Sequence, residues 1–274
     1  MADTRNLSLN TATVREQWSL AECIDGCVRH GIPGIAPWRD KLAELGAERA
    51  ERMIREAGLR VTGLCRGGMF PVANSKDRQA VVEDNRRAVD EALEIGAECL
   101  VLVVGGLPEG SKDIAGAREQ VRDGIATLLE YSRPRAMPLA IEPLHPMYAA
   151  DRACINTMAQ ANDLCDEFGA GLGIAVDIYH VWWDPNLRRE ILRAGRERLL
   201  AFHVCDWLVP TRDLLTDRGM MGDGVIDIPL IRSWVESAGY DGACEVEIFS
   251  SRDWWTRDPD EVLDVVKTRM EKAV

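Results

Sequence analysis

Two patterns of apolar and polar positions alternate along the whole chain. Eight short apolar segments have the length of buried β-strands, and each is followed by an amphipathic stretch with helical periodicity. The candidate strands are residues 6–10, 33–36, 60–65, 99–104, 138–142, 172–177, 199–204 and 243–248. Several amphipathic stretches end in glycine just before the next strand, at Gly31, Gly58, Gly96 and Gly169. Glycine suits the left-handed position at which many helices end.

Strand–helix alternation repeated eight times predicts parallel strands joined by right-handed crossovers. Eight such units close most naturally into a (β/α)8 barrel, and a chain of 274 residues suits one such domain over residues 1–274. An open, doubly wound sheet is the alternative. It is disfavoured because no GxGxxG or phosphate-binding loop follows an early strand. We therefore expect an α/β protein with a single TIM barrel.

The composition bears on partners and location. The 33 basic and 45 acidic residues leave a net charge of −12, which disfavours nucleic acid or an anionic membrane as partner. The eight cysteines contain no CxxC pair, so we interpret them as reduced thiols of a cytoplasmic protein. The first ten residues lack the pattern of a signal peptide, and no segment approaches the roughly 18 apolar residues of a membrane span.

The last four candidate strands each end in a side chain that can bind a metal ion. These are Glu142, Asp177, His203, and either Glu245 or Glu247. Because the carboxyl ends of barrel strands meet at one face, the four groups should converge there. Three carboxylates and one imidazole form an oxygen-rich set suited to Mn²⁺, Mg²⁺ or Co²⁺, and Zn²⁺ is also compatible.

The final strand, in GACEVEIFSS, leaves two choices for the fourth ligand. Side chains alternate along a strand, so Glu245 and Glu247 should face the same side, which is costly for two buried charges. The residues two before the other ligands are alanines, expected to form a layer of small side chains beneath the metal: Ala140, Ala175 and Ala201. The same count from Ala243 selects Glu245, but strands in a barrel are staggered, so the count alone does not decide.

Five motifs carry a resemblance to a known family: AIEPLH, AVDIYH, FHVCD, DRGMMGDGVID and VEIF, in that order. The chain resembles the sugar isomerase/epimerase superfamily with a xylose-isomerase-like barrel, and within it the inosose (2-keto-myo-inositol) isomerases and ketose 3-epimerases. The resemblance implies that the metal ligands are Glu142, Asp177, His203 and Glu247. It favours Glu247 because the family glutamate precedes a hydrophobic pair, and Glu245 would then need a buried partner such as an arginine, or a proton.

The resemblance also implies that His180 and Arg218 contact substrate oxygens. His145 stands in EPLHP, where relatives vary, and is a candidate for a further substrate contact or acid/base. Asp206 is a candidate for orienting a ligand or a loop, and the segment Arg66-Gly67-Gly68 for lining the pocket. Tryptophans are expected near the same mouth, where they suit the C–H face of a sugar, loop packing or an oligomer interface: Trp182, Trp183, Trp207, Trp254 and Trp255.

The function implied is a divalent-metal-dependent isomerase or epimerase of a keto-sugar or inosose, with Mn²⁺ as the preferred metal. Glu142 and Glu247 would act as the acid/base pair around a metal-stabilised enediolate. The partner is then a small sugar or cyclitol, with no nucleic acid or membrane partner, and a homo-oligomer is compatible.

Three alternatives keep the same barrel. The first is a metal-dependent lyase acting on 3-oxo-glycosides, including C-glycosides, with His145 as its base. The second is an endonuclease for abasic DNA, which the net charge of −12 and the presence of only four histidines oppose. The third is a sugar-binding barrel without activity, which the intact ligand set disfavours.

Overall fold

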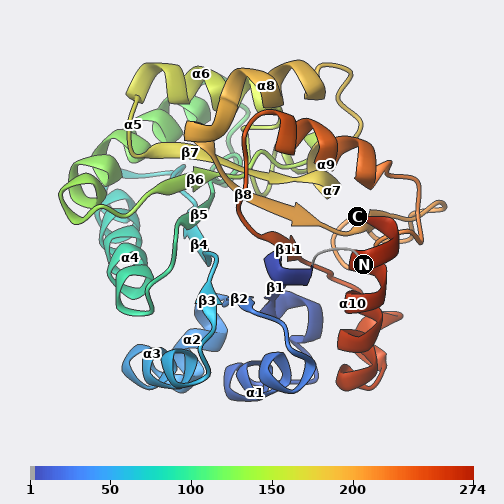
Figure 1. Ribbon diagram of the computed structural model, residues 1–274. Coiled ribbons are helices and arrows are strands. Elements are labelled where there is room, and N and C mark those ends of the chain that lie inside the picture. Colours follow the sequence, from blue (N-terminus) through green and yellow to red (C-terminus); the bar gives the residue numbers. More distant parts are fainter. Residues whose placement is uncertain (1–3) are drawn as a thin grey trace.

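A sheet of nine parallel strands winds into a nearly closed barrel in the computed structural model, which describes residues 4–274 (Figure 1). The strands are β1 (Leu7–Asn10), β2 (Gly34–Ala36), β3 (Arg60–Val61), β4 (Leu64–Gly68), β5 (Leu100–Val103), β6 (Leu139–Ile141), β7 (Leu172–Asp177), β8 (Leu199–Val204) and β11 (Cys244–Val246). Their order around the barrel is β3-β2-β1-β11-β8-β7-β6-β5-β4. The predicted single-domain α/β barrel is confirmed.

The third predicted strand, 60–65, is divided into β3 and β4. The chain changes its hydrogen-bonding partner there: Thr62 N donates to Ile35 O of β2, whereas Leu64 N donates to Cys99 O, next to β5. A bridge between Trp38 and Cys65 joins the two sides beyond this point. The barrel therefore still has eight β/α units.

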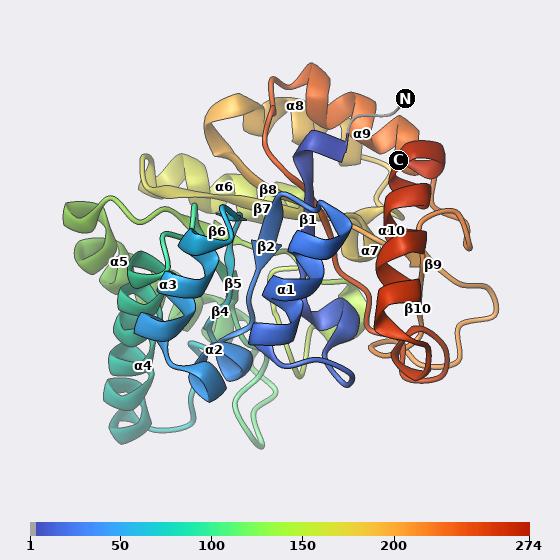
Figure 2. The same cartoon turned by 60° about the horizontal axis from the view of Figure 1, so that its bottom comes forward.

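Helices surround the barrel on its outside (Figures 1 and 2). They are α1 (Leu20–His30), α2 (Arg39–Leu45), α3 (Ala47–Glu56), α4 (Ser75–Glu94), α5 (Ile114–Ser132), α6 (Met158–Phe168), α8 (Leu187–Arg198), α9 (Ile228–Ser237) and α10 (Pro259–Ala273). The short helix α7 (Ile178–Val181) is instead a buried turn at the carboxyl end of β7. Short 3-10 turns are η1 (Thr4–Asn6), η2 (Thr11–Val14), η3 (Arg133–Arg135), η4 (Pro146–Tyr148) and η5 (Trp254–Thr256). In the long loop after β8, β9 (Asp206–Trp207) pairs antiparallel with β10 (Arg218–Gly219).

The helix ends follow the glycine pattern of the sequence. Gly31, Gly58, Gly96 and Gly169 all have positive φ, between 63° and 70°. At Gly31 the backbone N–H donates to the carbonyls of the last turn of α1, which would otherwise lack partners. The predicted helix ends are confirmed.

The first and last helices pack against each other and complete the outer ring. His30, in the last turn of α1, lies 2.8 Å from Asp260 and 2.9 Å from Asp264 of α10 through its two ring nitrogens. Arg29 pairs with the same Asp260 at 2.7 Å. These contacts account for His30 as a structural residue that joins α1 to α10.

The floor of the barrel is a layer of small buried side chains. The layer consists of Cys65, Cys99, Val101, Ala140, Ala175 and Ala201. The three alanines expected to face inward are all present in it. Small side chains fill the narrow barrel axis and leave the space above them to the polar side chains at the strand ends.

All eight cysteines are free and buried, and none forms a disulfide. Within residues 4–274, no helix has the length and apolar character needed to cross a membrane.

Candidate metal centre and active site

Four side chains at the carboxyl ends of β6, β7, β8 and β11 meet inside the mouth of the barrel. They are Glu142, Asp177, His203 and Glu247. One potential ligand atom from each lies within 4.8 Å of the others, and all four residues are buried. We refer to this set as the carboxylate–histidine cluster. It brings together the four residues that the family resemblance favours as metal ligands.

Glu247, and not Glu245, belongs to the cluster. The Cα register places Glu245 beside His203 of β8 and beside Ser8 of β1. Glu247 lies two residues further along the chain, where its N–H donates to Val204 O. Counting upward from the alanine layer therefore leads to the register partner of His203. Because barrel strands are tilted, register partners do not lie at equal depth, and the cluster contains the next inward-facing residue.

Glu245 is held by neutral donors inside the barrel. Asn10 Nδ2 donates to Oε1 at 2.7 Å and Thr62 Oγ1 donates to Oε2 at 2.8 Å. The Oε1 atom also lies 3.4 Å from His203 Nε2. Glu245 thus has buried partners, and they are an amide, a hydroxyl and an imidazole instead of the arginine named as an example.

His203 lies between two carboxylates. Its Nδ1 is 3.0 Å from Glu142 Oε1, and its Nε2 faces Glu245. Burial opposes protonation, but Glu245 and Glu142 outweigh it and raise the pKa of His203 well above its usual range. A carboxylate behind an imidazole orients the ring and increases its basicity as a metal ligand.

Arg218 occupies the opposite side of the cluster. It is buried, and its Nη1 lies 3.0 Å from both Asp177 Oδ2 and Glu247 Oε2. Its Nη2 lies 3.3 Å from His180 Nε2. The guanidinium carbon is 4.4 Å from the ring centre of Tyr179, on a face suited to a cation. The guanidinium thus compensates two carboxylates of the cluster.

The environment separates the pKa values of neighbouring acids. Burial raises the pKa of Glu247 to about 8, although Arg218 acts in the other direction. Burial also opposes ionisation of Asp177, but Arg218 and His180 lower the pKa of that carboxyl. Burial lowers the pKa of His180 to about 3, so its ring is neutral. Acids with pKa values pushed apart in one cavity can take different roles in proton transfer.

The raised pKa of Glu247 predicts a pH-dependent stability of the metal-free protein. A carboxyl with a higher pKa in the folded protein binds its proton more tightly there, so its stabilising effect is present below the ordinary value of 4.5 and lost as the pH approaches about 8. In a chelator, the free energy of unfolding should therefore fall over this range relative to Glu247→Gln, by at most about 1.4 kcal/mol per pH unit. Urea unfolding of both proteins measures the difference, and parallel pH profiles would contradict the prediction.

His145 lies at the rim of the mouth in an aromatic group and outside the cluster. Its Nδ1 accepts a hydrogen bond from Met147 N and thereby caps the N-terminus of η4. Its ring stacks on Trp207 at 5.0 Å and meets Trp183 edge-on at 5.8 Å. Burial lowers the pKa of His145, which keeps the ring neutral.

Only some of the five tryptophans line this rim. Trp182 is 5.8 Å from Trp207, in the group that also contains Trp183. Trp255 instead donates its indole N–H to Ala12 O, and Trp254 is buried under Arg257. The last two therefore serve the packing of the segment after β11.

Asp206 orders the loop that carries Arg218. Its carboxylate accepts hydrogen bonds from the backbone N–H groups of Gly222 at 2.9 Å, Gly224 at 2.8 Å and Ile226 at 3.0 Å. A Cβ at Gly224 would lie 2.2 Å from Trp207 O, so only glycine fits this close approach. Of the two roles considered for Asp206, the structure places it in the loop.

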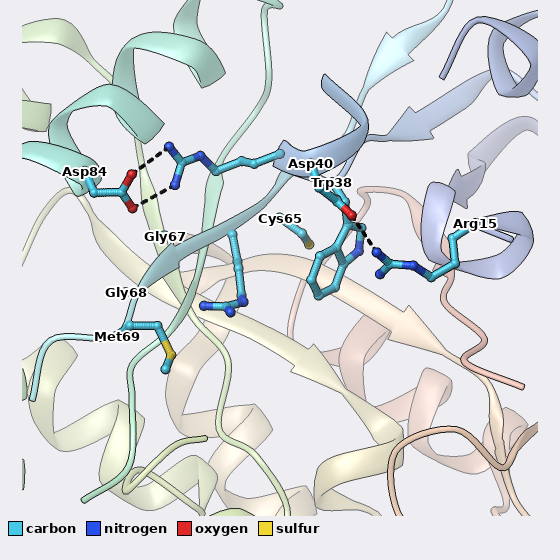
Figure 3. Close-up of a pocket in the computed structure, with 10 residues that line it drawn as sticks. Arg15, Trp38, Asp40, Cys65, Gly67, Gly68, Met69 and Asp84 are labelled. Atoms are coloured by element: carbon cyan, nitrogen blue, oxygen red, sulfur yellow. Dashed lines mark hydrogen bonds and ion pairs between the residues drawn. The ribbon is translucent and has the colours of Figure 1, made fainter. Parts of the chain in front are cut away.

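A cavity of about 440 Å³ opens at the same mouth, beside β2 and β4 (Figure 3). We call it the mouth pocket. Trp38 and Cys65 border it, as does the predicted segment Arg66-Gly67-Gly68. The sequence reasoning missed Asn10 and Trp38, although both stand at the carboxyl end of a strand. Applying the strand-end rule to the first two strands would have found them.

Several buried polar atoms near the cluster lack a hydrogen-bond partner within residues 4–274. They include His180 Nδ1, Arg218 Nε and the hydroxyl of Tyr148. The ring of Tyr148 lies 5.8 Å from that of His180. Buried polar groups rarely stay unpaired in folded proteins, so these atoms are candidates for contact with a polar ligand.

Residues 24–269 match the family described as xylose isomerase-like TIM barrel. The crystal structure of protein SMc04130 from Sinorhizobium meliloti 1021 is 57% identical over 99% of both chains, with a TM-score of 0.97. No curated protein matches the sequence.

Two more distant structures share the fold. The IOLI protein, whose structure has a binding zinc atom, is 18% identical over 96% of both chains, with a TM-score of 0.83. D-allulose 3-epimerase from Methylomonas sp. is 18% identical over 98% of both chains, with a TM-score of 0.79. The fold, the arrangement of strand-end residues and the sequence match agree, and the chain belongs to the xylose isomerase-like TIM barrel family.

Proposed function

We propose that the protein is a divalent-metal-dependent isomerase or epimerase of a keto-sugar or inosose. The observation that carries the proposal is the carboxylate–histidine cluster, whose ligand atoms lie within 4.8 Å of one another at the mouth of the barrel. The names of two fold relatives, a zinc-binding IOLI protein and a D-allulose 3-epimerase, are consistent with it.

The donor set suits a divalent cation. Glu142, Asp177, His203 and Glu247 offer three carboxylates and one imidazole, all buried. Such a concentration of buried carboxylates is costly unless a cation compensates it, and Arg218 contacts only two of them. Oxygen-rich ligands with one nitrogen favour Mn²⁺, with Mg²⁺, Co²⁺ and Zn²⁺ as alternatives.

Glu142 and Glu247 are the proposed acid/base pair. They follow β6 and β11, which are separated in the barrel by β7 and β8, so the two carboxyls approach the cavity from different sides. A divalent ion, when bound, would stabilise negative charge that develops on the substrate oxygens. One glutamate would then remove a proton from the carbon beside the carbonyl, and the other would return one. Return to the same carbon from the opposite face gives an epimer, and return to the neighbouring carbon moves the carbonyl.

His180, Arg218 and His145 are the proposed substrate contacts. His180 Nδ1 and Arg218 Nε are buried without partners, and the hydroxyls of a sugar would satisfy them. His145 presents a neutral ring on the aromatic rim, where a sugar face can stack. These groups would orient the substrate carbonyl between the two glutamates.

Hydrogen exchange tests the proposal directly. The Mn²⁺-loaded protein is incubated in D₂O with 2-keto-myo-inositol, D-fructose, D-tagatose and a 3-oxo-glucoside, and NMR follows deuterium at the carbon beside the carbonyl. We expect exchange and isomer formation with at least one substrate, and loss of both when a chelator removes the metal. Binding without exchange would contradict an isomerase, and release of an aglycone from the 3-oxo-glucoside would favour the lyase.

A further inference from the structure

Two arginines at the mouth of the barrel lack a counter-ion. Within residues 4–274, neither Arg66 nor Arg152 donates a side-chain hydrogen bond or lies within ion-pair distance of a carboxylate. The other arginines of the mouth pocket are paired: Arg15 with Asp40 at 2.5 Å, and Arg39 with Asp84 at 3.0 Å (Figure 3). Arg66 and Arg152 therefore remain as uncompensated charge in a chain whose net charge is −12.

A β-bulge positions Arg66. In the pairing of β4 with β5, Cys65 faces Val101 and Gly67 faces Leu102, so Arg66 is an extra residue without a partner. Cys65 belongs to the layer inside the barrel, and strict alternation would direct Arg66 outward to the helices. A bulge changes the direction of a side chain, and bulges are frequent at barrel rims beside active sites. Arg66 is half-buried and lines the mouth pocket.

Arg152 approaches Arg66 from the loop after β6. The loops after β5 and β6 are joined by backbone hydrogen bonds between Gly105 and residues Arg152 and Cys154. Gly105 in turn packs against the end of the strand that carries Arg66, because a Cβ on Gly105 would lie only 3.1 Å from Met69 Cα. Arg66 and Arg152 thus stand on adjoining segments of the mouth, and burial and then Arg152 lower the pKa of Arg66. Holding two like charges together is unfavourable, so the arrangement is explained most simply by an anion that binds between them.

Chains of neighbouring side chains lead from both arginines to the carboxylate–histidine cluster. Cys65, next to Arg66, accepts a hydrogen bond from Asn10 Nδ2 at 3.8 Å, and the same Asn10 amide binds Glu245. The guanidinium carbon of Arg152 lies 5.7 Å from the ring of Tyr148, and that ring is 5.8 Å from His180.

Both chains end on a member of the cluster. Glu245 Oε1 lies 3.4 Å from His203 Nε2, and His180 Nε2 lies 3.5 Å from Asp177 Oδ2. A ligand with its carbonyl at the cluster would extend toward Arg66 and Arg152 with its far end.

We infer that Arg66 and Arg152 bind an anionic group of the substrate, a carboxylate or a phosphate, at the end remote from the carbonyl. The inference rests on the proposed function for the keto-sugar part of the ligand. Planar guanidinium groups bind the oxygens of either anion in pairs, with charge-assisted hydrogen bonds. The substrate class is then a keto-sugar acid or a keto-sugar phosphate, rather than a neutral sugar.

Calorimetric titration of the Mn²⁺-loaded protein tests this at constant ionic strength. The ligands are D-fructose and D-tagatose with their 6-phosphates, and L-sorbose with its C6 carboxylate, 5-keto-D-gluconate. An anionic member should bind about ten- to a hundredfold more tightly than its neutral counterpart, as expected for charge-assisted hydrogen bonds. A preference for the phosphates identifies a phosphate site, and a preference for ketogluconate identifies a carboxylate site.

Variants assign the preference to the two arginines. In R66Q/R152Q the anionic and neutral ligands should bind with similar affinity, whereas R66K/R152K should keep part of the preference because the charge remains. The matched control is R49Q/R52Q, which removes two exposed arginines of α3 outside the pocket. Thermal unfolding verifies that each variant is folded. If the double variant does not fold, R152Q alone, which changes only a loop residue, should still reduce the preference for anionic ligands.

Two results would overturn the inference: equal affinity for neutral and anionic ligands in the unmodified protein, or a preference that survives in R66Q/R152Q. The second would place the anion on the metal instead. Deuterium exchange, measured separately, distinguishes failure of the proposed function. If the protein prefers anionic ligands but catalyses no exchange, the isomerase proposal fails and the anion site stands. If it exchanges neutral sugars and shows no preference for anions, the anion site fails and the isomerase proposal stands.

Discussion

Replacing Glu247 by glutamine should lower the rate of deuterium exchange by about a thousandfold or more, the effect expected when a general acid/base is lost. Glu247 is a member of the carboxylate–histidine cluster and one of the two carboxyls proposed to accept and return the proton. Glutamine keeps the size of the side chain but can do neither. The rate is measured in D₂O with saturating Mn²⁺ and the substrate that the unmodified protein exchanges fastest.

Glu245→Gln is the matched control, because it makes the same chemical change two residues away on the same strand. We expect exchange within about tenfold of the unmodified protein at saturating Mn²⁺, and weaker metal binding because Glu245 no longer supports His203. Stability should fall by about 1–3 kcal/mol, since the amide NH₂ group of glutamine cannot accept from Asn10 or Thr62. The opposite result, an inactive E245Q and an active E247Q, would assign catalysis to Glu245.

Replacing Arg218 by methionine should destabilise the metal-free protein by about 3–5 kcal/mol, because it leaves the buried carboxylates of Asp177 and Glu247 without their cation. Mn²⁺ should restore much of this loss, since a bound divalent ion compensates the same carboxylates. Urea unfolding in chelator and in Mn²⁺ measures both quantities. If R218M lowers the free energy of unfolding equally with and without Mn²⁺, Arg218 and the metal ion do not compensate the same carboxylates.

Arg196→Met provides the comparison at the surface. Arg196 of α8 is also paired with an aspartate, Asp241, but the two side chains are 71% and 77% exposed. Ion pairs that reach solvent contribute about 0–1 kcal/mol, so this variant should differ little from the unmodified protein and should not respond specifically to Mn²⁺. A loss as large as that of R218M would indicate that removing any paired arginine, rather than the buried charge of Arg218, limits stability.

The choice between Glu245 and Glu247 shows where sequence reasoning ended. Alternation along a strand correctly predicted that both glutamates face the inside, but alternation carries no information on depth. Depth depends on the tilt of the strands as well as on their register: the register pairs Glu245 with His203, yet Glu247 lies in the cluster. The motif VEIF favoured Glu247 only through the family resemblance, and not because any local property of the strand distinguishes the two residues.

Arg66 and Arg218 illustrate a second limit. Both were noted as pocket candidates, yet no sequence pattern indicates that Arg218 contacts two members of the cluster, or that Arg66 is the extra residue of a bulge. Arg152 carried no signal at all. Its position depends on a loop whose contacts are made with the loop after β5, and such contacts between loops leave no periodic pattern in the chain.

By itself, the sequence determined the eight β/α units, the helix ends at glycine and the four strand ends that carry ligand-type side chains. These properties are local: hydrophobic periodicity sets the elements, and parallel strands necessarily bring their carboxyl ends to one face. Only the tertiary structure decided the division of the third strand, the neutral partners of Glu245, the position of Arg218 against the cluster and the unpaired charges of Arg66 and Arg152. Each of these depends on stagger, bulges or loop packing between segments far apart in the chain, which no local pattern records.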